Sequence, residues 1–173
     1  MATPPPLPPA APLPGGPALL ELERRSRRQG AGIGTAELAG EWRLDQLWGK
    51  RDAAPQPGAA ALLRGLGACL AIRLESDPAG GSTTLQLRNS VQLGPLQLRF
   101  LGPGNLRGRR PLLVFRFERW QLLWGERLLA AGTLARPAPR REPFFALIAC
   151  GHGDGGPWLA ARGRGGGLAL WRR

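Results

Sequence analysis

The chain has 173 residues, of which 43% are hydrophobic, and it carries a formal net charge of +12 at pH 7. This length suits one domain plus a tail, and the charge favours anionic partners such as nucleic acid, acidic proteins or anionic lipid headgroups. No stretch reaches the ~18 apolar residues that span a membrane, and the N-terminus lacks the regions of a secretory signal. The sequence therefore predicts a protein that stays in the compartment where it is made. A compositional bias toward Arg, Ala, Gly and Pro explains much of the charge equally well.

The first 29 residues divide into a tail and a helix. Residues 1–17 are rich in proline, which predicts a disordered tail with polyproline II character; a ligand for an SH3-type domain is the alternative. Residues 18–29 predict a short helix that Gly30 ends. Its arginines crowd the C-terminal end: Arg24, Arg25, Arg27 and Arg28. This helix can lie on an anionic membrane surface, pack its leucines against the open end of a barrel, or do both.

From residue 39 onward, short alternating runs separated by turn signals predict β-strands. The clearest runs lie at 68–75, 83–93, 96–100, 112–120, 144–150, 158–161 and 168–171. A loop is expected at 102–111 and a helix at 59–65. About eight or nine such strands in a meander avoid open edges by closing into a barrel. The predicted fold is mainly β: a lipocalin-like antiparallel β-barrel over residues 18–173, with a short N-terminal helix against one opening.

Residue types that carry enzyme chemistry are sparse. His152 is the only histidine, and no G-x-S-x-G motif presents a nucleophilic serine. One histidine and two separated cysteines, Cys69 and Cys150, cannot supply the three or four ligands of a metal site. We therefore expect no enzyme activity, no cofactor and no metal. Both cysteines are expected to be buried free thiols rather than a disulfide.

The Gly-rich segment RGRGGG at 162–167 has two interpretations. It does not match the phosphate-binding G-x-x-x-x-G-K-[ST] pattern and does not lead into a helix, so we expect a turn with positive φ. It also resembles fragments of the arginine-glycine segments that bind nucleic acid. Because the phenylalanines fall at core positions, we expect no nucleic-acid partner. A basic nucleic-acid-binding barrel stays open as an alternative.

Two segments carry a family resemblance. The segment 38–44, LAGEWRL, resembles the L-x-G-x-W-x-L opening of the plastid-lipid-associated (fibrillin, plastoglobulin) family, with Gly40 and Trp42 at its fixed positions. The closing segment 158–170 is similar to that family's R-G-x-x-G step followed by an apolar strand, with Arg162 and Gly163 at the step. The resemblance runs in order over residues 19–173.

The resemblance implies non-catalytic binding of lipids or small hydrophobic molecules, such as quinones or carotenoids. Members of the family are peripheral thylakoid and plastoglobule proteins of plants and cyanobacteria. The resemblance therefore implies a cyanobacterial type that works in the cytoplasm at the thylakoid membrane surface, and we expect a monomer. The inward side chains expected to bury the ligand are Trp42, Leu44, Ile72, Leu85, Leu87, Phe100, Phe115 and Phe117. Two more alternatives are a lipocalin-like chromophore lyase for phycobiliproteins and a membrane-surface protein with a plugged interior.

Overall fold

The structure is a computed structural model that describes residues 11–50, 54–75, 84–138 and 141–173. Its helices are α1 (Gly16–Gln29), α2 (Thr35–Leu38) and α3 (Pro57–Gly65). Its strands are β1 (Gly40–Trp48), β2 (Cys69–Glu75), β3 (Thr84–Leu93), β4 (Leu96–Arg107), β5 (Leu112–Phe115), β6 (Arg119–Trp124), β7 (Arg127–Thr133), β8 (Phe144–Gly153), β9 (Gly156–Gly163) and β10 (Leu168–Arg172). None of the helices in these ranges is long and apolar enough to cross a membrane.

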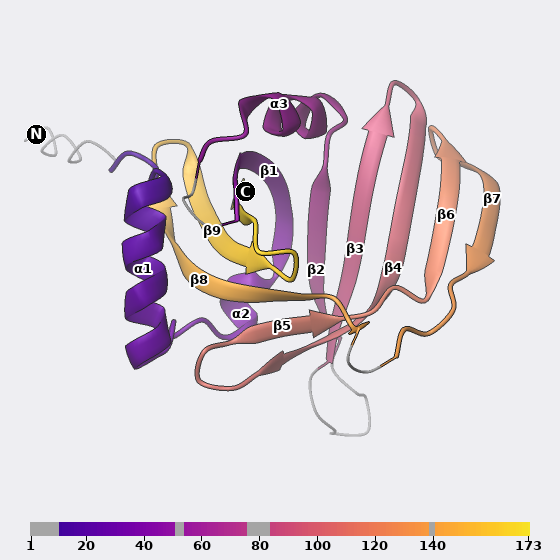
Figure 1. Ribbon diagram of the computed structural model, residues 1–173. Helices are drawn as coiled ribbons and strands as arrows, with labels where there is room; N and C mark the ends of the chain where they lie inside the picture. The colour runs from indigo at the N-terminus through magenta and orange to yellow at the C-terminus, as the bar shows by residue number, and fades with distance from the viewer. Residues whose placement is uncertain (1–10, 51–53, 76–83, 139–140) are drawn as a thin grey trace, which may run out of the picture.

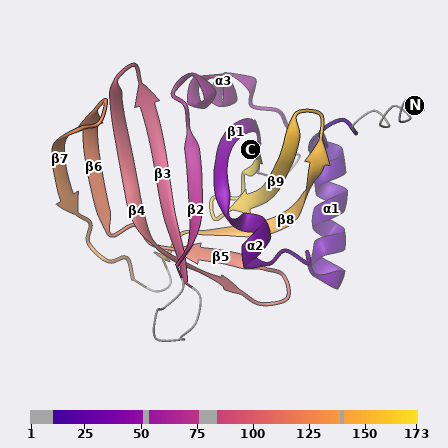
Figure 2. The same cartoon turned by 180° about the vertical axis from the view of Figure 1, so that it is seen from behind.

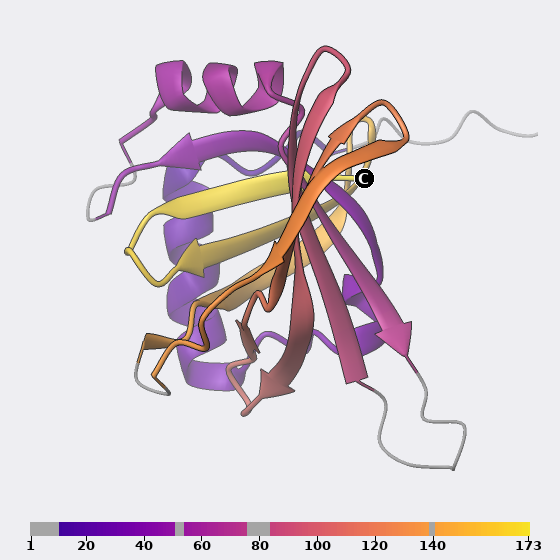
Figure 3. The same ribbon diagram turned by 90° about the vertical axis from the view of Figure 1, so that its right-hand side faces the viewer.

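Eight of the described strands form a barrel-like ring (Figures 1 and 3). The order around the ring is β3-β2-β1-β10-β9-β8-β5-β4, and the pairing of β3 with β4 completes it. Neighbouring strands are antiparallel. The prediction of a mainly β, antiparallel, barrel-like fold with a short N-terminal helix is confirmed. The helix expected at 59–65 is also present, as α3 between β1 and β2.

The β6–β7 hairpin lies outside the ring. It pairs with the first half of β4, Leu96–Leu101, while the second half of β4, Gly104–Arg107, pairs with β5. The single strand expected over 112–120 is therefore wrong, because β5 and β6 pair with different halves of β4. The simple meander is interrupted at the same place, since β5 pairs next with β8.

The loop predicted at 102–111 is also wrong in its first half, because β4 continues through it to Arg107. A Cβ on Gly102 would collide with the carbonyl oxygen of Arg116, and one on Gly104 would collide with the Leu87 side chain. Glycine within a strand marks such close approaches of backbone or side chain. The two glycines keep β4 in the sheet where it passes from β6 to β5.

Helix α1 lies along the outer wall of the ring rather than against an opening (Figure 1), which corrects the predicted position. Leu19 is fully buried in a second core that lies outside the ring. Its buried partners there are Trp48, Ile148, Ala160, Leu168 and Leu170. Strands β9 and β10 alternate between this outer core and the interior, so they are buried on both faces.

Residues 1–10 of the predicted tail lie outside the described residues. The amide of Asp154 donates a hydrogen bond to the carbonyl of Ala11 at 3.0 Å, and Leu13 packs against the outer core. The segment that leads into α1 therefore lies against the body of the protein.

Candidate functional site

An apolar cavity of about 560 Å³ occupies one part of the ring. Its walls come from β1, β2, β3, β5, β8 and β10, with Leu63 of α3 and the β9–β10 turn at its rim. Its lining residues are Leu44, Leu47, Leu63, Ala68, Cys69, Leu70, Asn89, Val91, Phe115, Phe117, Pro143, Phe144, Phe145, Gly163, Arg164, Gly165, Gly167, Ala169 and Trp171. Arg164 is the one charged residue of that set. The composition suits an apolar ligand with one polar end.

A chain of aromatic rings runs along the cavity. Phe115 lies 5.3 Å from Phe117 and 5.1 Å from Phe145, measured between ring centroids. Phe145 meets Trp171 edge-on at 5.3 Å, and Phe100 lies 5.8 Å from Phe117 at the other end. Such spacing lies in the range where aromatic pairs stabilise one another, so these rings form a preformed wall.

The other part of the interior is filled by side chains around Trp42. This ring is 1% exposed, and its Nε1 donates a hydrogen bond to the Leu38 carbonyl at 2.8 Å. The Arg173 guanidinium lies 4.5 Å from the Trp42 ring centre and covers its outer side. Figure 2 shows α2, which ends at Leu38, at the start of β1. The interior is thus plugged at this end and hollow at the other.

The predicted ligand-binding residues divide between these two parts. Leu44, Phe115 and Phe117 line the cavity. Phe100 does not line it but packs against Phe117. The other four pack in the core and are at most 2% exposed: Trp42, Ile72, Leu85 and Leu87.

Several cavity residues were not predicted, among them Leu47, Leu63, Phe145 and Trp171. The alternation within 168–171 places Trp171 on the same face as Ala169, and both point inward. That signal was available in the sequence for Trp171. Leu63 belongs to a helix, and nothing in its local pattern indicates that α3 borders the cavity.

The family-motif residues have structural roles in this chain. Gly40 has a φ of 139°, and a Cβ there would lie 2.7 Å from Nε of Arg173, so glycine lets Arg173 reach Trp42. The Gly163 amide donates to the Gly167 carbonyl at 2.9 Å and closes the β9–β10 turn at the cavity rim. The predicted turn with positive φ is present at Gly166.

Arg162 connects α1 to the ring through the buried carboxylate of Glu23. Its Nε and one terminal nitrogen donate to the two oxygens of Glu23 at 2.8 and 2.6 Å. Its other terminal nitrogen donates to the carbonyl of Lys50 at 2.9 Å and to that of Gly166. Arg27 and Arg110 add ion pairs to Glu23 at 2.9 and 3.4 Å. Three guanidinium groups therefore compensate one carboxylate that is 4% exposed.

The pKa of Glu23 gives this cluster a pH dependence. Burial raises the pKa, but hydrogen bonds and charges from Arg162 and Arg27 outweigh burial and leave it below the ordinary 4.5. A lowered folded-state pKa contributes stability above the unfolded pKa and loses it as the pH falls through the folded one. We expect the difference in unfolding free energy between the native protein and Glu23→Gln to be constant near pH 7 and to shrink below 4.5. Urea unfolding between pH 3 and 7 tests this, and a pH-independent difference would contradict it.

The arginines predicted to face a membrane surface lie on α1, but its leucine side is already buried against the ring. Arg24 pairs with Glu21 at 2.6 Å, and Arg27 is part of the Glu23 cluster. Nε of Arg25 donates to Gln29 at 3.3 Å, and Arg28 is exposed on the same side. Helix α1 can therefore present a basic face outward but has no free leucine face to insert.

The two cysteines are free and partly buried. Cys69 lines the cavity. Burial raises the pKa of its thiol, and the nearby Glu41 carboxylate raises it further. Burial also raises the pKa of the Cys150 thiol. A raised pKa disfavours the thiolate, so neither side chain is set up as a nucleophile.

No metal-binding cluster of three or more His, Cys, Asp or Glu residues occurs in the described part of the chain. His152 is exposed in β8, next to the β8–β9 turn. Comparisons with protein-family models, with curated proteins and with solved structures found no match for this chain.

Proposed function

We propose that this protein binds a lipid or small hydrophobic molecule, such as a quinone or carotenoid, without catalysis. The observation that carries the proposal is the cavity of about 560 Å³ with its nearly continuous apolar and aromatic lining. Ligand pockets typically measure about 300–1,000 Å³ and combine an apolar wall with a few polar groups. Each Å² of apolar ligand surface buried there contributes about 25 cal/mol.

The aromatic wall and the charged residue at the rim indicate how the proposed ligand lies in the cavity. The apolar body packs against the rings of Phe115, Phe117 and Trp171. A polar end of the ligand lies beside Arg164, whose guanidinium also donates to the Glu142 carbonyl at 3.0 Å. The resemblance to the fibrillin family supports the same ligand class and, with it, work at the thylakoid membrane surface.

The experiment compares cavity-filling variants with a matched surface variant. Ala169 lines the cavity, and Ala169→Phe should reduce affinity for a prenylated benzoquinone at least about tenfold by occupying the ligand's volume. Ala131→Phe makes the same change at an exposed position of β7 and should leave affinity unchanged. Quenching of tryptophan fluorescence measures binding, and circular dichroism checks folding.

Ala169→Phe adds volume to a packed region, and overpacking of this kind typically lowers stability by about 1–3 kcal/mol. A second variant at the rim of the cavity therefore separates loss of binding from loss of folding. Leu63→Trp on α3 narrows the cavity from a partly exposed position. Organic extraction of protein purified from its own host should release an apolar compound. The proposal would be overturned if no apolar compound is extracted and if the native protein, Ala169→Phe, Ala131→Phe and Leu63→Trp all have the same affinity for the quinone.

A further inference from the structure

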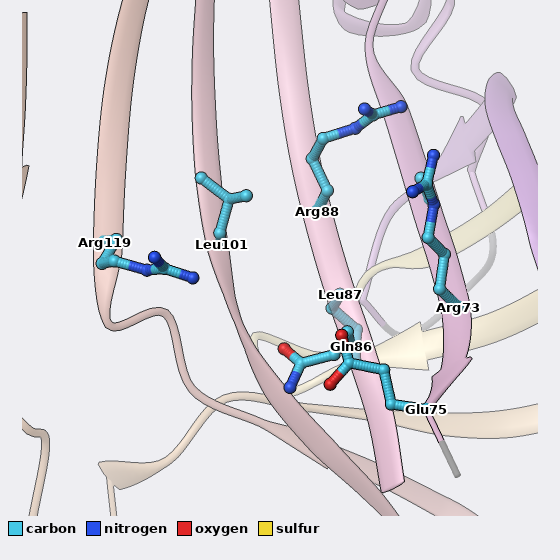
Figure 4. A pocket seen from close by; sticks show the side chains of 8 residues that line it. Arg73, Glu75, Gln86, Leu87, Arg88, Leu101 and Arg119 are labelled. Atoms are coloured by element: carbon cyan, nitrogen blue, oxygen red, sulfur yellow. The ribbon is translucent and has the colours of Figure 1, made fainter. Parts of the chain in front are cut away.

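The outer surface of the ring carries a cleft of about 300 Å³ that is separate from the cavity (Figure 4). It lies over β2, β3, β4 and β6. Its lining residues are Ala71, Arg73, Glu75, Gln86, Leu87, Arg88, Leu101 and Arg119. Three arginines from three different strands therefore share one concave surface.

Strand register explains why these side chains gather. Arg88 pairs across the sheet with Leu101 of β4, and Leu101 pairs with Arg119 of β6. Arg73 of β2 pairs with Gln86, two residues before Arg88 on β3. Residues directly opposite in a sheet point to the same face. Leu101 therefore lies between Arg88 and Arg119 on this face of the sheet. Arg73 lies on the same face, in the adjacent row of cross-strand pairs.

The charges in the cleft are only partly compensated. Within the described ranges, Arg73 and Arg119 have neither an ion pair nor a side-chain hydrogen bond. Arg88 pairs with Glu41 at 2.6 Å, but its Nε is buried and has no partner among the described atoms. In Figure 4 the Glu75 side chain points away from the Arg73 guanidinium. By contrast, Arg116, which follows β5, and Arg162 of β9 each form an ion pair with a glutamate.

We propose that this cleft binds a phosphate monoester group through Arg73, Arg88 and Arg119. Guanidinium groups donate paired, charge-assisted hydrogen bonds to phosphate oxygens, and the Gln86 amide can add a neutral donor. The unpaired Nε of Arg88 supplies a buried donor that an anion would satisfy. The cleft is too small, and has too few aromatic rings, to serve as a base-stacking surface. The phosphate belongs either to a lipid headgroup or to a free metabolite.

The test uses the full-length protein with two probes. Soluble glycerol phosphate is titrated by calorimetry, and vesicles containing phosphatidic acid are tested by co-sedimentation. Arg119→Gln and Arg73→Gln should each weaken binding about tenfold, as expected for loss of a charge-assisted hydrogen bond. Arg127→Gln is the matched control, because it removes one charge from an exposed position at the start of β7, outside the cleft.

The outcomes separate the sources and the two proposals. Binding of glycerol phosphate that only the cleft variants weaken supports a free phosphate ester, whereas the same pattern with vesicles alone supports a lipid headgroup. Saturable binding of neither probe, or an equal loss in Arg127→Gln, would overturn the inference. Because the cavity shares only β2 and β3 with the cleft and does not include Arg73, Arg88 or Arg119, Ala169→Phe should leave phosphate binding unchanged. The proposed function and this site can therefore fail independently.

Discussion

Replacing Trp42 by alanine is expected to lower the free energy of unfolding by about 4 kcal/mol, the middle of the range for truncating a large buried aromatic ring. Trp42 is 1% exposed and packs at the plugged end of the ring. The substitution removes apolar contacts, leaves the Leu38 carbonyl without its donor, and removes the ring beneath Arg173. The packing loss dominates, because a cation–π contact adds only about 0.5–1 kcal/mol at exposed sites.

Urea denaturation followed by circular dichroism measures this effect. The matched control is Trp124→Ala, which removes the same side chain from a position that is 56% exposed. That change should stay within about 0.5 kcal/mol, as is usual for surface positions. An equal loss of unfolding free energy in Trp42→Ala and Trp124→Ala would contradict the role of Trp42 in filling this end of the ring.

Replacing Arg162 by alanine is expected to cost about 3 kcal/mol of stability. The substitution leaves the Glu23 carboxylate, which is 4% exposed, without its bidentate partner. Removing one member of a buried ion pair is costly because the remaining charge stays desolvated. The carbonyls of Lys50 and Gly166 lose their donor as well. Arg27 and Arg110 still contact Glu23, which places the cost at the lower end of the usual range.

The control for this prediction is Arg24→Ala, which breaks the exposed pair with Glu21. Exposed pairs contribute about 0–1 kcal/mol, so this variant should unfold almost like the native protein. A double variant, Glu23→Leu with Arg162→Met, should recover part of the loss because no buried charge remains unpaired. Equal stability of Arg162→Ala and Arg24→Ala would contradict the structural role assigned to Arg162.

The sequence could predict the strands that have one buried and one exposed face. The expected runs 68–75 and 83–93 match β2 and β3 within a residue. The predicted strand 96–100 is shorter than β4, because Gly102 and Gly104 are residues typical of loops. Glycine is required at these two positions because Arg116 and Leu87 approach the backbone closely, and this approach exists only in the folded structure. The leucines of α1 indicated a buried side but not the wall against which it packs.

The cavity was predictable only in outline. Alternation shows which side chains point inward, and three of the residues expected to point inward, Leu44, Phe115 and Phe117, line the hollow part. Alternation does not show where the interior is filled, because that depends on how Trp42 and its neighbours divide the volume. The outer cleft was not predicted, since it needs the lateral register of β2, β3, β4 and β6.

The pairing of β1 with β10 has a consequence for how the protein folds. Leu44 pairs with Trp171, so the first strand of the ring closes against the last. During synthesis, the ring can close only after residues 168–172 have been made and can pair with residues 40–48. Contacts between distant parts of a chain carry a large loop-closure cost and slow folding. Until the ring closes, the edge of β1 that pairs with β10 has unpaired backbone groups, and such an edge can pair with another chain and lead to aggregation.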